Sequence, residues 1–325
     1  MHMSPVLHKM SVGSEVNPVS DQAGLLTIQQ VSRLLGVPTP TIRSWERRYG
    51  LPQASRTAAG HRRYSPEQVQ ALGRMRDAIT RGHVSAEAAN LAKTTTMRTQ
   101  AAQPLIDALL DAAQQLEPDQ ITTILDAASR QLGLDATMDD VLLPAMRQIG
   151  DKWQTGRCNV AHEHLTTETV RAWLAHTAAA NPARDARQPV ILTCGPNDHH
   201  TLGLDAIGAL LRRRGWPCRH LGASVPADSL AAAIRQVKPA AAVLVSHLPA
   251  CRPAAVHALH AAMEALHTAR LPTSRLYYAG NAFTTSEARD GAPGTYLGAD
   301  LSEAADLITT NADDTTSSAQ HPDPR

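Results

Sequence analysis

Three residues with the chemistry of a metal-binding loop stand close together in the second half of the chain. Asp198, His200 and Gly203 form a D-x-H-x-x-G pattern between an apolar run, Val190–Cys194, and a segment with helical spacing, residues 204–214. An imidazole can ligate a transition metal, and a carboxylate two residues earlier can accept the second ring N–H, which fixes the tautomer and strengthens the donor. Alone the pattern is weak, because a loop histidine near an aspartate is also a common polar contact.

A second group of residues, near the N-terminus, has the chemistry of a nucleic-acid contact. Residues 25–86 contain ten arginines and three acidic residues, whereas the whole chain of 325 residues has a net charge of +1. Such an uneven charge distribution is typical of a module that binds nucleic acid. The side chains expected at the major groove and along the phosphates are Thr41, Arg43, Ser44 and Arg47 on a helix, and Arg56, His61, Arg62 and Arg63 in the loop after it.

The segments around these arginines predict short helices separated by tight turns. Thr27 can cap a helix over residues 28–35 that Gly36 ends, and a second helix runs through Tyr49. Ser65, followed by proline, can cap a third helix. Two short helices joined by a glycine-containing turn indicate a helix-turn-helix.

The elements around the Asp198–His200 pattern predict an α/β domain. Short apolar runs alternate with helical segments, which favours a doubly wound parallel sheet of the flavodoxin or Rossmann type, with ligands at the carboxyl ends of its strands. The expected strands are residues 190–194, 218–221, 241–245, 276–279 and 295–297, and the expected helices are residues 204–214, 227–237, 254–269 and 301–309.

The stretch between these two regions has helical spacing throughout. Residues 104–180 predict a four-helix bundle, with polar linkers expected at residues 93–103 and 180–189. The fold class is therefore multi-domain, α plus α/β. The expected boundaries are a disordered leader at 1–23, a winged helix-turn-helix at 24–92, the bundle at 104–180, the sheet domain at 189–310 and a disordered tail at 311–325.

The N-terminal stretch resembles a known family over residues 25–72. It is similar to the winged helix-turn-helix of MerR-type regulators, including an R-x-W-E-R core with Arg43, Trp45 and Arg47, and a wing G-H-R-R-Y ending at Tyr64. The resemblance implies that these residues, Trp45 and Tyr64 among them, bind double-stranded operator DNA.

The Asp198–His200 pattern resembles the base-off, His-on cobalamin-binding domain of methionine synthase, mutases and related sensors. The resemblance implies that His200 is the lower axial ligand of cobalt, that Asp198 supports it, and that Gly203 lets the nucleotide tail pass close to the backbone. Ser246 and Leu248 match the S-x-L motif of that domain, where the serine meets the dimethylbenzimidazole tail. Only Gly280 remains of the usual Gly-Gly pair, since Ala279 precedes it.

A third pattern lies in the bundle, where Trp153 is followed by Glu163 and His164. A tryptophan in a bundle core and a solvated Glu-His pair would also explain it. Ahead of a cobalamin domain, however, W-x9-E-H resembles the CarH/LitR class of light-responsive repressors, in which the bundle caps adenosylcobalamin. The resemblance implies that these three residues contact the upper face, with the tryptophan against the adenosyl group and the glutamate on its ribose.

One departure from that class concerns the residue after the tryptophan. Photoreceptors of the class can carry a histidine there, which captures cobalt once light has broken the Co–C bond, whereas this chain has Gln154. An amide is a poor cobalt ligand. Which ligand takes the free face of cobalt after photolysis is therefore left open, and His162 and His164 are the nearby candidates.

Composition excludes several other functions. The four cysteines are widely spaced, which favours free thiols over a disulfide framework or zinc site. No apolar run approaches the roughly 20 residues that span a bilayer, and no signal peptide is present, so a cytoplasmic protein without a membrane partner is expected. The leading hypothesis is a non-enzymatic, light-responsive repressor that binds its operator as a homo-oligomer, dimer or tetramer, loaded with adenosylcobalamin. The alternatives are a cobalamin sensor that ignores light and a corrinoid methyl-transfer module.

Overall fold

The computed structural model describes residues 25–57, 59–154, 159–181 and 187–319. The side chains of Trp153, Gln154 and residues 313–319 are not described. The expected leader and half of the second linker, residues 182–186, therefore lie outside the described residues.

The N-terminal unit is a winged helix-turn-helix, as the sequence predicts. It consists of α1 (Ile28–Leu35), α2 (Thr39–Tyr49), the antiparallel strands β1 (Ser55–Arg56) and β2 (Arg62–Arg63), and α3 (Pro66–Thr80). Thr27 and Ser65 form capping boxes at the first and third helices, which satisfies backbone N–H groups that a helix start leaves unpaired. A separate apolar core holds the unit together.

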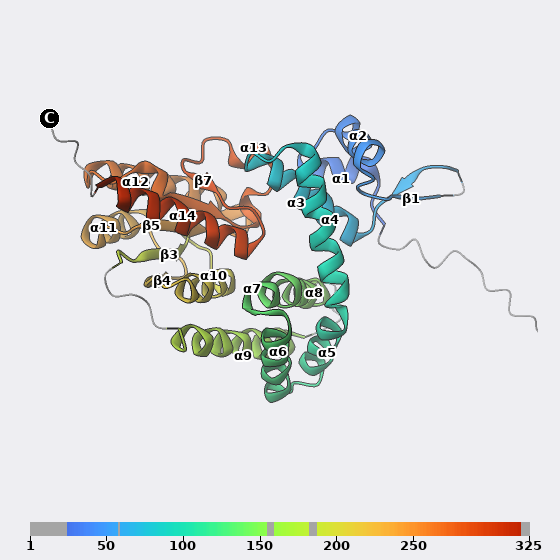
Figure 1. The fold of residues 1–325 in the computed structure, drawn as a ribbon, viewed down its shortest axis with the longest axis horizontal. Helices are drawn as coiled ribbons and strands as arrows, with labels where there is room; N and C mark the ends of the chain where they lie inside the picture. The colour runs from blue at the N-terminus through green and yellow to red at the C-terminus, as the bar shows by residue number, and fades with distance from the viewer. Residues whose placement is uncertain (1–24, 58, 155–158, 182–186, 320–325) are drawn as a thin grey trace, which may run out of the picture.

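Helical structure replaces the linker expected at residues 93–103, apart from a turn at Ala102. Helix α4 (Ser85–Ala101) runs without interruption from the winged helix to the bundle (Figure 1). The segment is polar, but it contains no glycine or proline before Pro104, and its side chains find partners. Arg74 of α3 donates to the Thr96 hydroxyl at 2.8 Å, and that hydroxyl donates to the backbone oxygen of Ala92. The linker prediction was wrong because polarity alone does not end a helix.

The expected bundle has four antiparallel segments. They are α5 (Gln103–Gln114), α6 (Pro118–Leu132), a composite third segment, and α9 (Val160–Ala179). The composite segment joins α7 (Leu134–Ala136), a π-helical stretch η1 (Thr137–Leu142) and α8 (Leu143–Gln154). A π-helical stretch is rare and changes the direction in which successive side chains point.

The sheet domain is doubly wound and entirely parallel, which confirms the predicted fold class. Its strands lie in the order β4 (Cys218–Gly222), β3 (Val190–Cys194), β5 (Ala241–Val245), β6 (Leu276–Ala279) and β7 (Thr295–Tyr296). The remaining elements are α10 (Leu202–Arg213), α11 (Ala227–Val237), η2 (Pro249–Cys251), α12 (Arg252–Thr268), η3 (Thr273–Arg275), η4 (Asn281–Phe283), α13 (Ser286–Arg289) and α14 (Leu301–Ala319).

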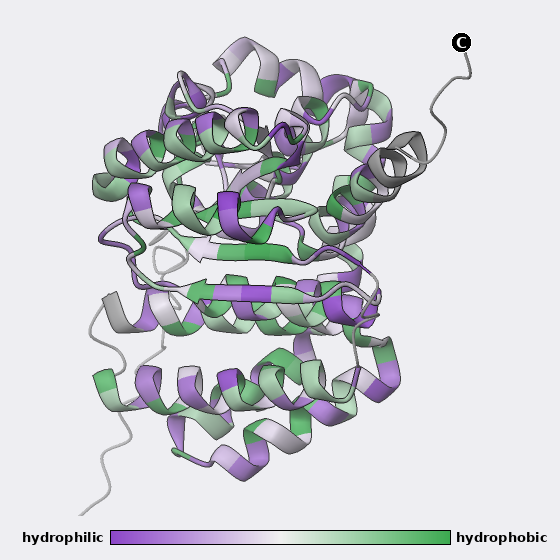
Figure 2. Cartoon of the chain, turned by 90° about the vertical axis from the view of Figure 1, so that its left-hand side faces the viewer, coloured by the Kyte–Doolittle hydropathy of each residue, from purple (hydrophilic) through white to green (hydrophobic). Residues whose placement is uncertain are grey.

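Alternate strand residues pack against helices on opposite faces of this sheet. Val190 and Leu192 belong to a core shared with α10 and α14, whereas Ile191 lies in a second core with α11 and α12. The hydrophobic strands lie between layers of helices (Figure 2). The first core continues through Trp173 and Leu174 of α9 into the bundle. The bundle and the sheet domain therefore share one continuous apolar interior.

The tail expected to be disordered from residue 311 begins as helix. Helix α14 continues to Ala319, and the Asn311 side chain donates to the hydroxyl of Tyr277 at 3.0 Å. Ala312 is buried against the sheet. The prediction was wrong for residues 311–319, because the helix begun at Leu301 is continued by the buried Ala312 and by the contact of Asn311 with the sheet. Among the residues that the structure describes, no helix is long and apolar enough to cross a bilayer.

Two adjacent aspartates of η1 connect the three units. Asp139 accepts hydrogen bonds from the backbone N–H groups of Leu301 and Ser302, at 2.8 and 3.2 Å, and so caps α14 of the sheet domain. Asp140 pairs with Arg98 of α4 at 3.3 Å. The π-helical stretch thus contacts the helix that carries the winged helix and the last helix of the sheet domain.

Asp139 should make stability depend on pH. Burial, with the nearby Asp300 carboxylate, raises the pKa of Asp139 to about 7, although the positive charge of Arg147 acts against this. Because folding raises this pKa, the stabilisation is present below about pH 4 and is lost as the pH rises through about 7. Asp139→Asn removes the titrating group, so we expect it to flatten this profile.

Urea unfolding across this pH range, with exposed Asp111→Asn as the control for charge alone, tests the prediction. A wild-type profile that Asp139→Asn leaves unchanged would contradict it.

Candidate functional site

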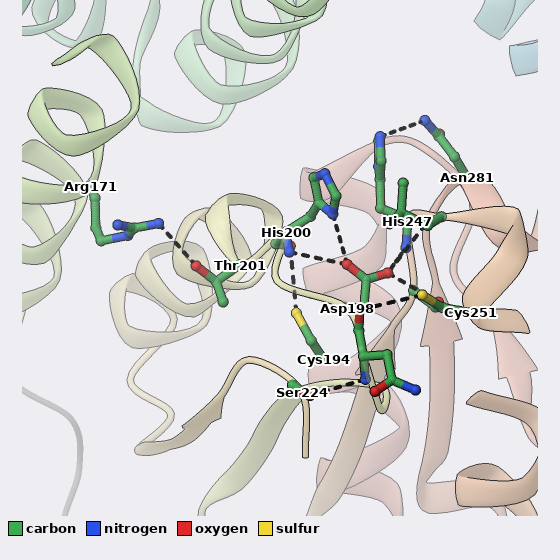
Figure 3. Close-up of polar contacts among 12 residues, drawn as sticks. Arg171, Cys194, Asp198, His200, Thr201, Ser224, His247, Cys251 and Asn281 are labelled. Carbon is green, nitrogen blue, oxygen red and sulfur yellow. Dashed lines mark hydrogen bonds and ion pairs between the residues drawn. The ribbon is translucent and has the colours of Figure 1, made fainter. Parts of the chain in front are cut away.

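The loop between β3 and α10 holds Asp198 and His200 in contact. The Asp198 side chain is fully buried, whereas 49% of the His200 side chain is exposed. The Nδ1 atom of His200 lies 2.8 Å from Oδ1 of Asp198, and the same oxygen accepts the backbone N–H of His200 at 3.1 Å (Figure 3). This contact assigns the ring proton to Nδ1, so Nε2 is the nitrogen with a free lone pair.

Asp198 is held in its ionised form by a shell of donors. Its Oδ2 accepts from the Ser246 hydroxyl at 3.1 Å and from the backbone N–H groups of His247 and Leu248 at 2.5 and 3.2 Å. Burial alone would raise the pKa of this carboxyl, but the hydrogen bonds from His200, His247 and Leu248 lower it to about 2. A carboxylate that is charged throughout the physiological range can support a basic imidazole beside it.

The second loop of the site follows β5 and lies across the point where the strand order reverses. In such sheets ligands bind at this point, beyond the carboxyl ends of the strands. Ser246 is fully buried here, whereas the Leu248 side chain stays 41% exposed. The sequence pattern placed both residues at the site, and the structure brings both loops together through Asp198.

The two glycines of the pattern have different surroundings. A Cβ atom on Gly203, at the start of α10, would meet nothing within 4 Å, so its surface is open to a ligand. Gly280 has φ +106°, and a Cβ there would lie 2.1 Å from the backbone oxygen of Ser246. The close approach that requires glycine at position 280 is therefore to the β5 loop of the protein itself.

Three contact residues were not predicted from the sequence. The His247 ring stacks on the His200 ring with centroids 4.6 Å apart, and Asn281 Nδ2 lies 3.2 Å from His247 Nε2. Arg171 of α9 donates to the Thr201 hydroxyl at 3.2 Å, beside the histidine loop. His247 stands inside the S-x-L motif and could have been noticed there, whereas the other two contacts come from distant segments.

The residues expected to cap the cofactor stand where α8 ends and α9 begins. Glu163 lies in the first turn of α9, where its carboxylate accepts from the Thr167 hydroxyl at 3.0 Å and lies 3.4 Å from His164. The His164 side chain is 72% exposed. His162 accepts the backbone N–H of Asn159 at 3.3 Å and so takes part in capping this helix. Trp153 lies in the last turn of α8, and its side chain is outside the described residues.

Most residues expected to contact DNA are exposed or partly exposed on the winged helix. Arg43, Arg47, Arg56 and His61 are exposed, and Thr41, Ser44, Arg62 and Arg63 are partly exposed. Arg62 of the wing donates from Nε to Glu46 of α2 at 2.5 Å. The wing is therefore tied to the second helix by an ion pair.

Two residues of this set belong to the interior. Tyr64 is fully buried, and Trp45 is 8% exposed in the core of the winged helix. The prediction of direct DNA contact was wrong for these side chains, because the strand bridge between Leu26 and Tyr64 and the packing of α2 turn them inward. Their burial gives both side chains a structural role in the core of the winged helix.

Known protein families match all three units. Residues 26–94 match the MerR HTH family regulatory protein, and residues 105–177 and 189–299 match two B12 binding domain families. Two curated relatives come from Myxococcus xanthus. The HTH-type transcriptional repressor CarA is 36% identical over 66% of this chain and 74% of its own length, and the HTH-type transcriptional repressor CarH is 31% identical over 65% and 75%.

A solved structure supports the fold alone. The Methanosarcina barkeri monomethylamine corrinoid protein aligns with 64% of this chain and 99% of its own, with a TM-score of 0.50 and 16% identity.

These observations first define a class, namely DNA-binding regulators that carry a corrinoid-binding bundle and sheet. The chain belongs to the family of MerR-type transcriptional regulators with B12-binding domains, to which the CarA and CarH repressors are related. Its cofactor is accordingly a cobalamin.

The residues present fit such a cofactor. His200 offers Nε2, for which no hydrogen bond is found among the described residues, while Asp198 holds its other nitrogen. The open surface at Gly203 lies at the start of α10, and the exposed Leu248 lies on the loop after β5. A cobalamin bound here would supply a cobalt ion with an axial position for the imidazole.

Proposed function

We propose that this protein is a light-responsive repressor that binds operator DNA as a homo-oligomer loaded with adenosylcobalamin, and that it acts without catalytic turnover. The observation that carries the proposal is the Asp198–His200 pair at the switch point of a sheet whose core continues into the bundle. The relatives named as repressors support the regulatory role. A corrinoid methyl-transfer module, the rival function, does not need a winged helix.

We propose a division of labour that follows the three units. The winged helix contacts DNA through its exposed arginines, His200 ligates cobalt from below, and Trp153, Glu163 and His164 face the adenosyl group from the bundle. Glu163 and His164 support this assignment by position, because they lie in the first turn of α9, next in the chain to the end of α8.

Binding of adenosyl-, methyl- and hydroxocobalamin to the purified protein tests the proposal. We expect the adenosyl form to be retained best and to be the form that promotes oligomerisation, and green light to reverse both, since Co–C photolysis belongs to the cofactor. Glu163→Ala should reduce the preference, and Asp111→Ala, which changes an exposed carboxylate on α5 of the same bundle, serves as its control. Equal binding of the three forms and equal oligomer mass would contradict the adenosyl assignment. If the protein prefers adenosylcobalamin but illumination changes neither binding nor oligomerisation, the light-independent sensor is the remaining alternative.

Gln154 should determine what happens after illumination. The amide is a poor ligand, so we expect the photoproduct to lose cobalamin more readily than that of Gln154→His, which offers a nitrogen donor. His162 is engaged in capping α9, which leaves the exposed His164 as the better substitute. Spectra and cobalamin retained after desalting compare the two proteins. A bis-imidazole spectrum in the wild type that persists in His164→Ala would show that another residue takes the cobalt.

The wing arginines should provide binding that does not depend on base sequence. Arg62→Ala should weaken binding to every DNA and reduce the slope of log affinity against log salt by about one unit, because one phosphate contact releases about one counterion. The ion pair with Glu46 provides a matched variant. Glu46→Gln removes a negative charge from the same surface and should not weaken binding. Fluorescence anisotropy over a salt series measures both, with Arg235→Ala, exposed on α11, as the control. An unchanged slope in Arg62→Ala would rule out the contact.

A further inference from the structure

The cobalt-facing histidine has one hydrogen bond that fixes its ring. Nδ1 of His200 contacts Asp198, and the side chain is otherwise half exposed. A single hydrogen bond restrains a point on the ring but lets the plane tilt about the line that joins the two atoms. A ligand nitrogen that must meet an axial position needs both its place and its plane restrained.

The His247 ring supplies the second restraint. It lies against the His200 ring with an interplanar angle of 29° and a centroid separation of 4.6 Å. Offset stacking at such a distance is favourable for aromatic rings. Figure 3 shows the two rings rising side by side from their separate loops, above Asp198. Tilting of His200 would break this contact.

His247 is itself anchored at both ends. Its backbone N–H donates to Oδ2 of Asp198, while Oδ1 of the same carboxylate holds His200. At the far end of the ring, Asn281 Nδ2 lies 3.2 Å from Nε2 and can donate to it. One buried carboxylate therefore places both histidines, and the amide of η4 fixes the orientation of the second ring.

We propose that His247 is a positioning residue for the cobalt ligand, which holds the plane of the His200 imidazole by stacking and is oriented by Asn281. This inference rests on the proposed role of His200 in cobalamin binding. The stacked ring performs this role, and its Nε2 serves only to anchor the ring to Asn281. A phenyl group at position 247 should therefore replace it, and an aliphatic side chain should not.

The axial nitrogen can be observed directly in the Co(II) form of bound cobalamin. Its electron paramagnetic resonance signal is split by one axial nitrogen, and labelling the histidines with nitrogen-15 changes the splitting only if that nitrogen comes from the protein. We expect His247→Ala to retain cobalamin about two- to tenfold less well than the wild type. Its signal should show a smaller or broader contribution from the protein nitrogen. His247→Phe should restore most of both, and Asn281→Ala should show a similarly small defect, because each keeps the stacked ring and loses the hydrogen bond at Nε2.

Thermal unfolding of the cofactor-free proteins separates these effects from loss of the fold. Normal retention and an unchanged nitrogen signal in His247→Ala would overturn the inference. A His247→Phe variant as defective as His247→Ala, with a normal unfolding temperature, would also overturn it, because the nitrogens would then be needed. If His200→Ala keeps the protein-nitrogen splitting, the proposed ligand itself is wrong. If His200→Ala loses it while His247→Ala does not, only the positioning role fails.

Discussion

Replacing His200 with alanine should reduce the retention of cobalamin by at least about a hundredfold. Loss of a residue that only supports a metal ligand already costs about 10- to 100-fold, and this change removes the ligand itself. The spectrum of any cofactor that remains should no longer be that of the His-on form. Gel filtration with adenosylcobalamin, followed by absorbance of the protein peak, measures both effects.

Two neighbouring changes make this test specific. His199→Ala removes an exposed imidazole from the adjacent position and should bind normally. Asp198→Asn keeps the shape of the supporting residue but removes its charge, so retention should fall by about 10- to 100-fold. If His200→Ala binds cobalamin normally and His199→Ala does not, the ligand is His199 and the assignment to His200 is wrong.

Replacing Gly280 with alanine should destabilise the folded protein before any cofactor is added. Its φ of +106° is strained for residues with a side chain, and the new Cβ would lie 2.1 Å from the Ser246 oxygen. The β5 loop would have to move, and with it the donors to Asp198. We expect the free energy of unfolding to fall by about 3 kcal/mol or more, with loss of cobalamin binding. Chemical denaturation of the cofactor-free protein measures the first effect.

Gly203→Ala is the matched control, because nothing lies within 4 Å of its new Cβ and the position is helical. Alanine there should leave stability equal or improve it by about 0.5–1 kcal/mol. Any loss of cobalamin affinity in this variant would then report a ligand that passes close to the backbone. A Gly280→Ala protein with unchanged stability would contradict the packing argument.

The sheet was predictable because its signals are local. Strands β3, β5 and β6 are runs of apolar residues bounded by turns, and all three have the expected limits. The two wrong boundaries, at residues 93–103 and 311–319, were both placed where polar residues begin. There the helices continue because their partners come from elsewhere in the fold, such as Tyr277 for Asn311.

The site was predictable only where sequence neighbours form it. Asp198 and His200 are two residues apart, so their contact follows from one loop. Asn281 and Arg171 reach the site from distant elements, and no local sequence pattern predicts their contacts. Tyr64 shows the opposite error, because it lies within a DNA-binding motif but faces the core.

The uninterrupted helix α4 acts as a spacer between the winged helix and the bundle. Its seventeen residues, at about 1.5 Å each, span about 25 Å. Each residue added to the helix would rotate the winged helix by about 100° relative to the bundle. The direction in which Arg43 and Arg47 face therefore depends on the helical phase of α4, together with the ion pair between Arg81 and Glu303 of α14. In the oligomer proposed above, the length of α4 would help to set the separation of the DNA half-sites. A change in the length of α4 would then change the preferred spacing of the half-sites without altering any residue proposed to contact DNA.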